Sequence, residues 1–280
     1  MMENNGHHSS ASLPDEFVSR LIPALDDETV TAIILHGSYA RGDAQPPYSD
    51  VDLVRITKET PERTQQKRFL WYDGYLLNLS SRPLSVYREW LKLSQEAVYR
   101  VSTIRDARIL VEKDGSFRAF QQEVLTHWSW EPLQADANAY AGQLLAELSE
   151  VILRTMGALR LQKTTMLVER ICLHILPAVT EAVGVQRGIL ATGNDYLHQI
   201  QETIGRDSSW TRLYMDAAGV SEKGEMPISL KTRGIAALHV YQETIRLLRP
   251  HLLPEHIETI EPLPGMIDEG VEETIRVRFD

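Results

Sequence analysis

The chain has 280 residues, of which 43% are hydrophobic and 24% charged, and it carries a formal net charge of −10. This composition is typical of a globular protein in water, and no stretch approaches the roughly 18 consecutive apolar residues of a transmembrane helix, so we expect no membrane span. The acidic balance argues against a long nucleic acid as partner, because proteins that bind polyanions usually present a basic surface.

A single cysteine, Cys172, excludes an intramolecular disulfide, and the apolar helical sequence around it predicts a buried side chain. The N-terminal residues are polar and lack the apolar core of a secretory signal. Residues 1–14 are therefore predicted to form a disordered leader, and the protein is expected in the cytoplasm.

The next part of the chain mixes short β-branched apolar runs with helical patterns, which is typical of an α/β domain. The predicted strands and hairpin lie at 29–37, 51–57, around the turn Asp73-Gly74, and at 107–115. The predicted helices lie at 15–25, 83–93 and 116–128. We therefore expect a domain with a mixed sheet over residues 15–131.

After Glu131 and Pro132, apolar residues recur every three or four positions with scarcely a strand signal, which predicts an all-α helical bundle over 132–280. Long helical runs are expected at 135–183, 194–205 and 228–249, whereas the end of the chain is acidic and broken by prolines. Residues 116–280 carry 15 basic and 22 acidic side chains, so this part would attract a small cationic molecule.

The segment HGSYARGDAQPPYSDVDL, which begins at His36, carries the groups best suited to chemistry. Gly37 and Ser38 follow a predicted buried strand and open a turn that can run into a short helix. Glycine lets the backbone approach a phosphate, a serine hydroxyl adds a donor, and helix-start amides favour anions. This turn is therefore a candidate phosphate-binding site.

Asp50 and Asp52 stand at positions i and i+2 along the next predicted strand, so their carboxylates project from the same face. Two such carboxylates repel each other unless a cation lies between them, and hard oxygen ligands suit Mg²⁺ that carries a nucleoside triphosphate (NTP). The pair is therefore a candidate magnesium site.

The pattern GSxxxG, followed by a proline-containing loop and SDxDL, resembles the signature of the polymerase beta-like nucleotidyltransferase superfamily. The matching positions are Gly37, Ser38, Arg41, Gly42, Ser49, Asp50, Asp52 and Leu53. An α/β domain followed by a helical one also looks like the small-molecule branch of this superfamily, such as the aminoglycoside nucleotidyltransferases. In those members the helical domain helps to hold the acceptor.

The resemblance implies that an acceptor hydroxyl attacks the α-phosphate of a Mg²⁺-bound NTP, with ATP the favoured donor, and that pyrophosphate leaves. It implies that Gly37 and Ser38 bind the nucleotide, together with Ser49 and Arg41, although Arg41 is equally well explained as a solvent-facing helix residue. Asp50 and Asp52 are then the metal ligands and catalytic residues.

Members of the superfamily commonly carry a third carboxylate on a neighbouring strand, and here the corresponding strand offers only Asn78. An amide cannot remove a proton from an alcohol. Glu169, among residues expected to be buried in the helical domain, is a candidate base, and an ion pair on an exposed helix face is its structural alternative. Asp73 is better explained by the hairpin turn.

These residues fit three functions. The first is transfer of a nucleotide to a hydroxyl of a small, cationic molecule such as an aminoglycoside-like antibiotic. The second is modification of a protein hydroxyl, as in the nucleotidyltransferase half of some toxin–antitoxin pairs. The third is a nucleotide-binding regulatory protein with a degenerate active site, which the missing third carboxylate favours.

Overall fold

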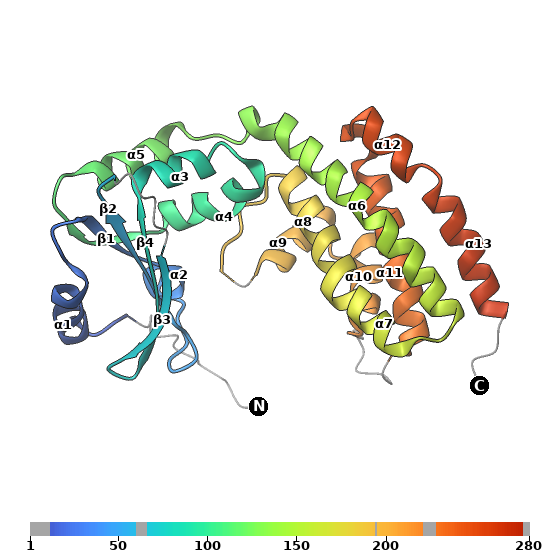
Figure 1. Cartoon of the computed structure of the whole chain (residues 1–280), viewed down its shortest axis with the longest axis horizontal. Coiled ribbons are helices and arrows are strands. Elements are labelled where there is room, and N and C mark those ends of the chain that lie inside the picture. Colours follow the sequence, from blue (N-terminus) through green and yellow to red (C-terminus); the bar gives the residue numbers. More distant parts are fainter. Residues whose placement is uncertain (1–11, 60–65, 194, 221–227, 277–280) are drawn as a thin grey trace, which may run out of the picture. The chain divides into compact units, whose positions relative to one another are not determined.

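The computed structural model describes residues 12–59, 66–193, 195–220 and 228–276. Most of the predicted leader lies outside these residues. The chain divides into two compact units, Met1–Ser129 and Trp130–Asp280. The first unit contains a mixed sheet with helices and the second is mostly helical, as the sequence predicted (Figure 1).

The sheet of the first unit has five strands in the order β3-β4-β2-β1-β5. The strands are β1 (Val30–His36), β2 (Val51–Thr57), β3 (Gln66–Tyr72), β4 (Tyr75–Pro83) and β5 (Arg108–Glu112). The pair β2 and β4 is parallel and the other neighbouring pairs are antiparallel. All the strands predicted from the sequence are present.

Helices cover both faces of this sheet. They are α1 (Asp15–Leu25), α2 (Gly37–Arg41), α3 (Leu84–Trp90), α4 (Ser94–Arg105) and α5 (Ser116–His127). Figure 1 shows α3, α4 and α5 together beside the strands, with α1 apart from them. Helix α4 was not predicted individually; its buried side is made of small residues such as Ala97, Val98 and Val101, which give only a modest apolar signal.

Strand alternation decides which side chains reach which face. The odd-numbered residues of β1 and β2, such as Ile33 and Leu53, pack with Phe17 of α1 in one apolar cluster. The even-numbered residues point to the opposite face, where Asp52 lies across from His36 of β1. The candidate catalytic carboxylate therefore projects on the side away from α1.

The hairpin between β3 and β4 has the predicted two-residue turn. Asp73 and Gly74 both have positive φ, 50° and 81°, and Tyr72 pairs with Tyr75 across the turn. Asp-Gly suits this turn type because both central residues must adopt the left-handed region. The turn fixes the register that places Lys67 of β3 opposite Ser80 of β4.

The second unit contains no strand among its described residues. Its helices are α6 (Gln134–Arg160), α7 (Thr164–Glu169), α8 (Leu176–Gln186), α9 (Tyr196–Ile204), α10 (Ser209–Ala218), α11 (Leu230–Leu248), α12 (Pro254–Ile260) and α13 (Leu263–Arg276). A buried cluster that includes Leu145, Val183 and Tyr241 joins α6, α8 and α11. This is the helical bundle that the apolar spacing predicted.

The acidic, proline-containing end of the chain also belongs to the predicted helical part. It forms α12 and α13, because Pro254 and Pro264 stand in the first turns of these helices, where proline removes no needed hydrogen bond. One sequence prediction for this unit is wrong. Cys172 is exposed rather than buried. It lies in a π-helical segment, Arg170–Ile175, whose wider turn shifts side chains away from the positions that an α-helical spacing predicts.

Within the part of the chain that the structure describes, no helix has both the length and the apolar character needed to cross a membrane.

Gly74 offers a test of the hairpin turn. A Cβ at this position would meet nothing within 4 Å, so Gly74→Ala adds only the strain of a positive φ, and we expect it to lower the free energy of unfolding by about 1–2 kcal/mol. Gly157→Ala in α6 is the control, because a Cβ there also meets nothing within 4 Å and the backbone is helical. That change should raise stability by about 0.5–1 kcal/mol. Urea unfolding measures the free energy of unfolding of both variants. A change of the same sign in both variants would contradict the turn assignment.

Candidate active site

The turn after β1 brings the backbone against a carboxylate. Gly37 has a φ of +71°, and a Cβ at this position would overlap the Asp52 side chain. Only glycine satisfies both the positive φ and the close approach. Helix α2 begins at Gly37 and ends at Gly42, whose φ is +84°. The GSxxxG pattern therefore corresponds to a tight strand–turn–helix next to Asp52.

Asp50 immediately precedes β2, and Asp52 is the second residue of that strand. Burial and, next to it, the negative charge of Asp50 raise the pKa of Asp52 to about 6. The two carboxylates thus repel each other in a partly desolvated place. A cation between them would remove this repulsion.

Asn78 occupies the position on β4 that pairs with Asp52. Its Nδ2 donates a hydrogen bond to Asp52 Oδ1 at 2.7 Å, and this bond favours the ionised carboxylate. The strand neighbour of Asp52 is therefore an amide, as expected from the sequence, and it acts as a hydrogen-bond donor toward the carboxylate.

Arg41 and Ser49 both have partners in the loop between β1 and β2. Arg41 Nε donates a hydrogen bond to Asp43 Oδ2 at 3.1 Å. The backbone N–H of Gln45 donates a hydrogen bond to Ser49 Oγ at 2.8 Å. Both residues therefore contribute to the shape of this loop. Arg41 also lies close enough for its charge to lower the pKa of Asp52.

Two further carboxylates from the sequence analysis have other partners. Asp73, which lies in the hairpin turn, forms an ion pair with Arg20 of α1. Glu169 belongs to the second unit, where its side chain is 55% exposed and its Oε1 lies 3.9 Å from His174 Nε2. Of the two alternatives that the sequence left open for Glu169, the exposed helix face is the one observed, with His174 rather than an arginine as the partner. Residues five apart meet here because the π-helical segment that begins after Glu169 has a wider turn.

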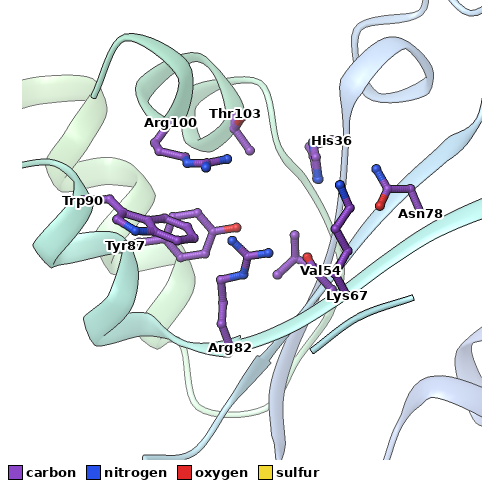
Figure 2. Close-up of a pocket in the computed structure, with 10 residues that line it drawn as sticks. His36, Val54, Lys67, Asn78, Arg82, Tyr87, Trp90, Arg100 and Thr103 are labelled. Carbon is purple, nitrogen blue, oxygen red and sulfur yellow. The ribbon is translucent and has the colours of Figure 1, made fainter. Parts of the chain in front are cut away.

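A cavity of about 340 Å³ lies on the same face of the sheet as Asp52, next to α3 and α4 (Figure 2). The lining residues are His36, Val54, Lys67, Asn78, Ser80, Arg82, Tyr87, Trp90, Arg100 and Thr103. Three of them carry a full positive charge and none is a carboxylate. Asn78 contributes to the cavity wall while it donates to Asp52, so the cavity adjoins the carboxylate pair.

The two arginines of the cavity stack on an aromatic ring. The Cζ atoms of Arg82 and Arg100 lie 4.8 Å and 4.3 Å from the ring centre of Trp90. Figure 2 shows both guanidinium groups directed toward the space that His36 faces from β1. Burial lowers the pKa of His36 to about 4, and the charge of Arg82 is the next cause, so this imidazole is neutral at pH 7.

The sequence analysis did not assign the cations of this cavity to the site. Arg82 continues the alternation of Asn78 and Ser80 on β4, so strand periodicity alone could have placed it on the same face. Lys67 and Arg100 carry no comparable local signal, because their approach depends on the pairing of β3 and on the packing of α4. Among the tryptophans of the first unit, Trp90 lines the cavity, whereas Trp71 of β3 is 72% exposed.

The residues present fit a magnesium ion bound together with a nucleotide. Mg²⁺ keeps several waters and is usually held in such sites by one or two carboxylates and by substrate phosphates. Asp50 and Asp52 supply two carboxylates, and their mutual repulsion favours a cation. No cluster of three or more His, Cys, Asp or Glu suited to a metal ion occurs in the described ranges.

Comparison with known families supports the resemblance for the first unit. Residues 18–111, about a third of the chain, match the family described as a nucleotidyltransferase domain. This segment contains α1 from its fourth residue onward, all the strands except the last residue of β5, and both candidate metal ligands. The first unit therefore has the sequence features of a nucleotidyltransferase domain, and nucleotidyl transfer is the general reaction that this match supports.

A solved structure with similarity over most of the chain is the nucleotidyltransferase-like protein from Exiguobacterium sibiricum 255-15. The two chains are 15% identical, the match covers 95% of this chain and 94% of the other, and the TM-score is 0.47. No curated protein sequence matches this chain.

The opposite pKa shifts of Asp52 and His36 predict opposite effects of acid on stability. The pKa of Asp52 rises from 3.8 to about 6 on folding, so its contribution to stability is present at low pH and is lost as the pH rises through 6. The pKa of His36 falls from 6.5 to about 4, so its contribution is present above pH 6.5 and is lost as the pH falls toward 4.

Relative to wild type, Asp52→Asn should therefore lose stability more steeply on acidification, and His36→Asn less steeply. Urea unfolding at about pH 7 and about pH 5 measures these differences. If the free energy of unfolding changed equally in all three proteins between the two pH values, the pKa shifts assigned to Asp52 and His36 would be wrong.

Proposed function

We propose that this protein transfers a nucleoside monophosphate from a Mg²⁺-bound NTP, with ATP the favoured donor, to a hydroxyl of a small molecule. The observation that carries the proposal is the position of Asp50 and Asp52 at the start of β2, with the Gly37 turn directly against the Asp52 carboxylate. This arrangement fits a phosphate-bound cation, and the nucleotidyltransferase domain match over residues 18–111 supports the reaction class.

In the proposed reaction the acceptor oxygen forms a bond to the α-phosphorus, and the bond from that phosphorus to pyrophosphate breaks. Pyrophosphate leaves with the bonding electron pair. Bound Mg²⁺ would neutralise charge that develops on the phosphates. Asp50 and Asp52 would hold it, and Gly37, Ser38, Arg41 and Ser49 would position the nucleotide.

The hydroxyl proton needs an acceptor, and Asn78 cannot serve because its amide nitrogen is a donor. Asp52 adjoins the cavity, because Asn78, which lines it, donates a hydrogen bond to this carboxylate. Its Oδ1 accepts the bond from Asn78, which leaves Oδ2 for another partner. Glu169 of the second unit is the alternative proton acceptor that the sequence proposed.

A second candidate function is nucleotide binding without efficient transfer. It is favoured by the amide of Asn78 at the strand position where the superfamily commonly has a carboxylate. A regulatory protein of this kind would bind the NTP through the same Gly37 turn and carboxylate pair, and it would release little pyrophosphate.

Pyrophosphate release separates these functions. With Mg²⁺ and a panel of hydroxyl compounds that includes aminoglycosides, we expect acceptor-dependent release by the wild type and a loss of at least about 100-fold in Asp50→Asn and in Asp52→Asn, because each change removes a metal ligand. Release that persists unchanged in both variants would remove the metal assignment.

Asp73→Asn is the matched control for these variants. Asp73 lies in the turn of the same unit and has a φ of +50°, a conformation that asparagine tolerates, so the change should leave pyrophosphate release intact. Glu169→Gln tests the alternative proton acceptor. A loss of release in Glu169→Gln with unchanged NTP affinity would assign this role to Glu169 instead of Asp52.

Asn78→Asp tests the second candidate function. The change places a third carboxylate directly beside Asp52, so we expect it to tighten Mg²⁺ binding several-fold and to raise the pKa of Asp52 further in the metal-free protein. If the wild type binds NTP without release and Asn78→Asp gains release, the wild-type site is degenerate. If the wild type releases pyrophosphate and Asn78→Asp is slower, the amide is part of a working site.

A further inference from the structure

The cavity next to α3 and α4 differs in charge from the chain that forms it. The chain has a formal net charge of −10, whereas Lys67, Arg82 and Arg100 line the cavity without a carboxylate among the lining residues. We propose that this cavity binds an anionic group of the acceptor, a carboxylate or a phosphate. This inference rests on the proposed function and names its acceptor class, which differs from the cationic acceptor suggested by the net charge.

Arg82 lacks the negative partner that a partly buried cation normally has. It forms no ion pair among the described residues, and its Nε is buried without a hydrogen-bond partner there. Glu96, the carboxylate that attracts both arginines, accepts a hydrogen bond from Arg100 Nε at 3.0 Å. Because an unpaired charge away from water is unfavourable, an anionic ligand is the natural partner for Arg82.

The two guanidinium groups are held in place before any ligand binds. Both stack on Trp90, and Arg82 also lies 5.6 Å from the ring centre of Tyr87. Stacking fixes the plane of a guanidinium while its N–H groups stay free for bonds in that plane. Such donors suit the oxygens of a carboxylate or phosphate, which arginine binds in a bidentate manner.

His36 is also exposed to the positive charge of the cavity. This side chain lines the cavity, and after burial the charges of Arg82 and Arg100 are the largest causes of its lowered pKa. A neutral imidazole adds hydrogen-bonding capacity without adding charge. Ser80 and Asn78 provide further neutral polar groups on β4, so an oxyanion in the cavity would meet both charge and hydrogen-bonding groups.

The strand register places Val54 and the cavity wall around it farther along β2 than the Gly37 turn. His36 pairs with Asp52, so Gly37 and Ser38, which follow His36, lie beside the first residues of β2. Val54, which lines the cavity, is two residues farther along β2 in the other direction. A ligand in the cavity would therefore approach Asp52 from the side opposite the proposed nucleotide turn.

The size of the cavity limits the ligand. Its volume of about 340 Å³ is at the lower end of the roughly 300–1,000 Å³ that small-molecule pockets occupy. A compact hydroxyl compound with one anionic group fits this space. In the proposed reaction the hydroxyl of that compound forms the bond to the α-phosphorus, pyrophosphate leaves, and the anionic group stays bound by the arginines.

Inorganic phosphate is the probe for this site, measured by calorimetry on the full, nucleotide-free chain. We expect Arg82→Gln and Arg100→Gln each to weaken phosphate binding at least about tenfold, because each removes charge-assisted hydrogen bonds. Arg88→Gln is the matched control, since Arg88 lies on α3 outside the cavity and pairs with Glu123, and its phosphate affinity should equal that of wild type. Absence of phosphate binding by the wild type at millimolar concentration overturns the proposal.

Titration with ATP and Mg²⁺ distinguishes the acceptor from the nucleotide as the source of the anion. If the cavity belongs to the acceptor, Arg82→Gln and Arg100→Gln keep ATP affinity within about twofold of wild type. A parallel loss of ATP and phosphate affinity would assign the cavity to the NTP phosphates. Phosphate binding that is lost in Ser38→Ala but kept in both arginine variants would place the ion at the turn. Either result overturns the proposal.

The last experiment compares pyrophosphate release with two hydroxyl compounds that differ by one phosphate, glycerol 3-phosphate and glycerol. If the wild type releases pyrophosphate, we expect faster release with the phosphorylated compound, and this preference should disappear in Arg100→Gln. A preference for cationic aminoglycosides that survives in Arg100→Gln contradicts the anionic acceptor. Phosphate binding does not require catalysis. If only the transferase proposal fails, phosphate still binds but pyrophosphate is not released; if the anion site fails, phosphate does not bind.

Discussion

The pairing of β1 with β2 is the constraint on which the candidate site depends. It sets His36 opposite Asp52, and this register brings the Gly37 turn against the Asp52 carboxylate. The next pairing, between β2 and β4, sets Asn78 beside the same carboxylate. A shift of one residue in either register would turn these side chains to the other face, which is filled by the apolar cluster under α1. The core therefore fixes the geometry of the polar site.

The same face of the sheet carries two regions of opposite charge. Asp50 and Asp52 gather negative charge at the beginning of β2, and their repulsion raises the pKa of Asp52. The positive charges of Arg82 and Arg100 lie in the cavity beside this pair, where both guanidinium groups stack on Trp90. Partial burial strengthens both fields, because water screens them less than it would at the surface. A reaction between a metal-bound nucleotide and an anionic acceptor would use both regions, with each ligand neutralising one of them.

The two units contribute differently to this interpretation. The first unit holds the carboxylate pair, the turn and the cavity, and the family match falls within it. The second unit is a helical bundle whose apolar cluster is its own. Its candidate base, Glu169, is exposed and lies near His174, at the start of a π-helical segment. Such segments often occur at functional sites, and the exposed position of Glu169 matches the helix-face alternative that the sequence offered.

The sequence alone determined the strands, the Asp73-Gly74 hairpin, the helical second part and the residues of the GS and DxD motifs. These features depend on local periodicity, on turn residues and on short spacing, which a single segment contains. Only the tertiary structure decided that Arg100 of α4 meets Arg82 of β4 across one aromatic ring. It also decided that Cys172 is exposed. These outcomes depend on contacts between distant segments and on a local change in helix type, neither of which leaves a regular pattern in the sequence.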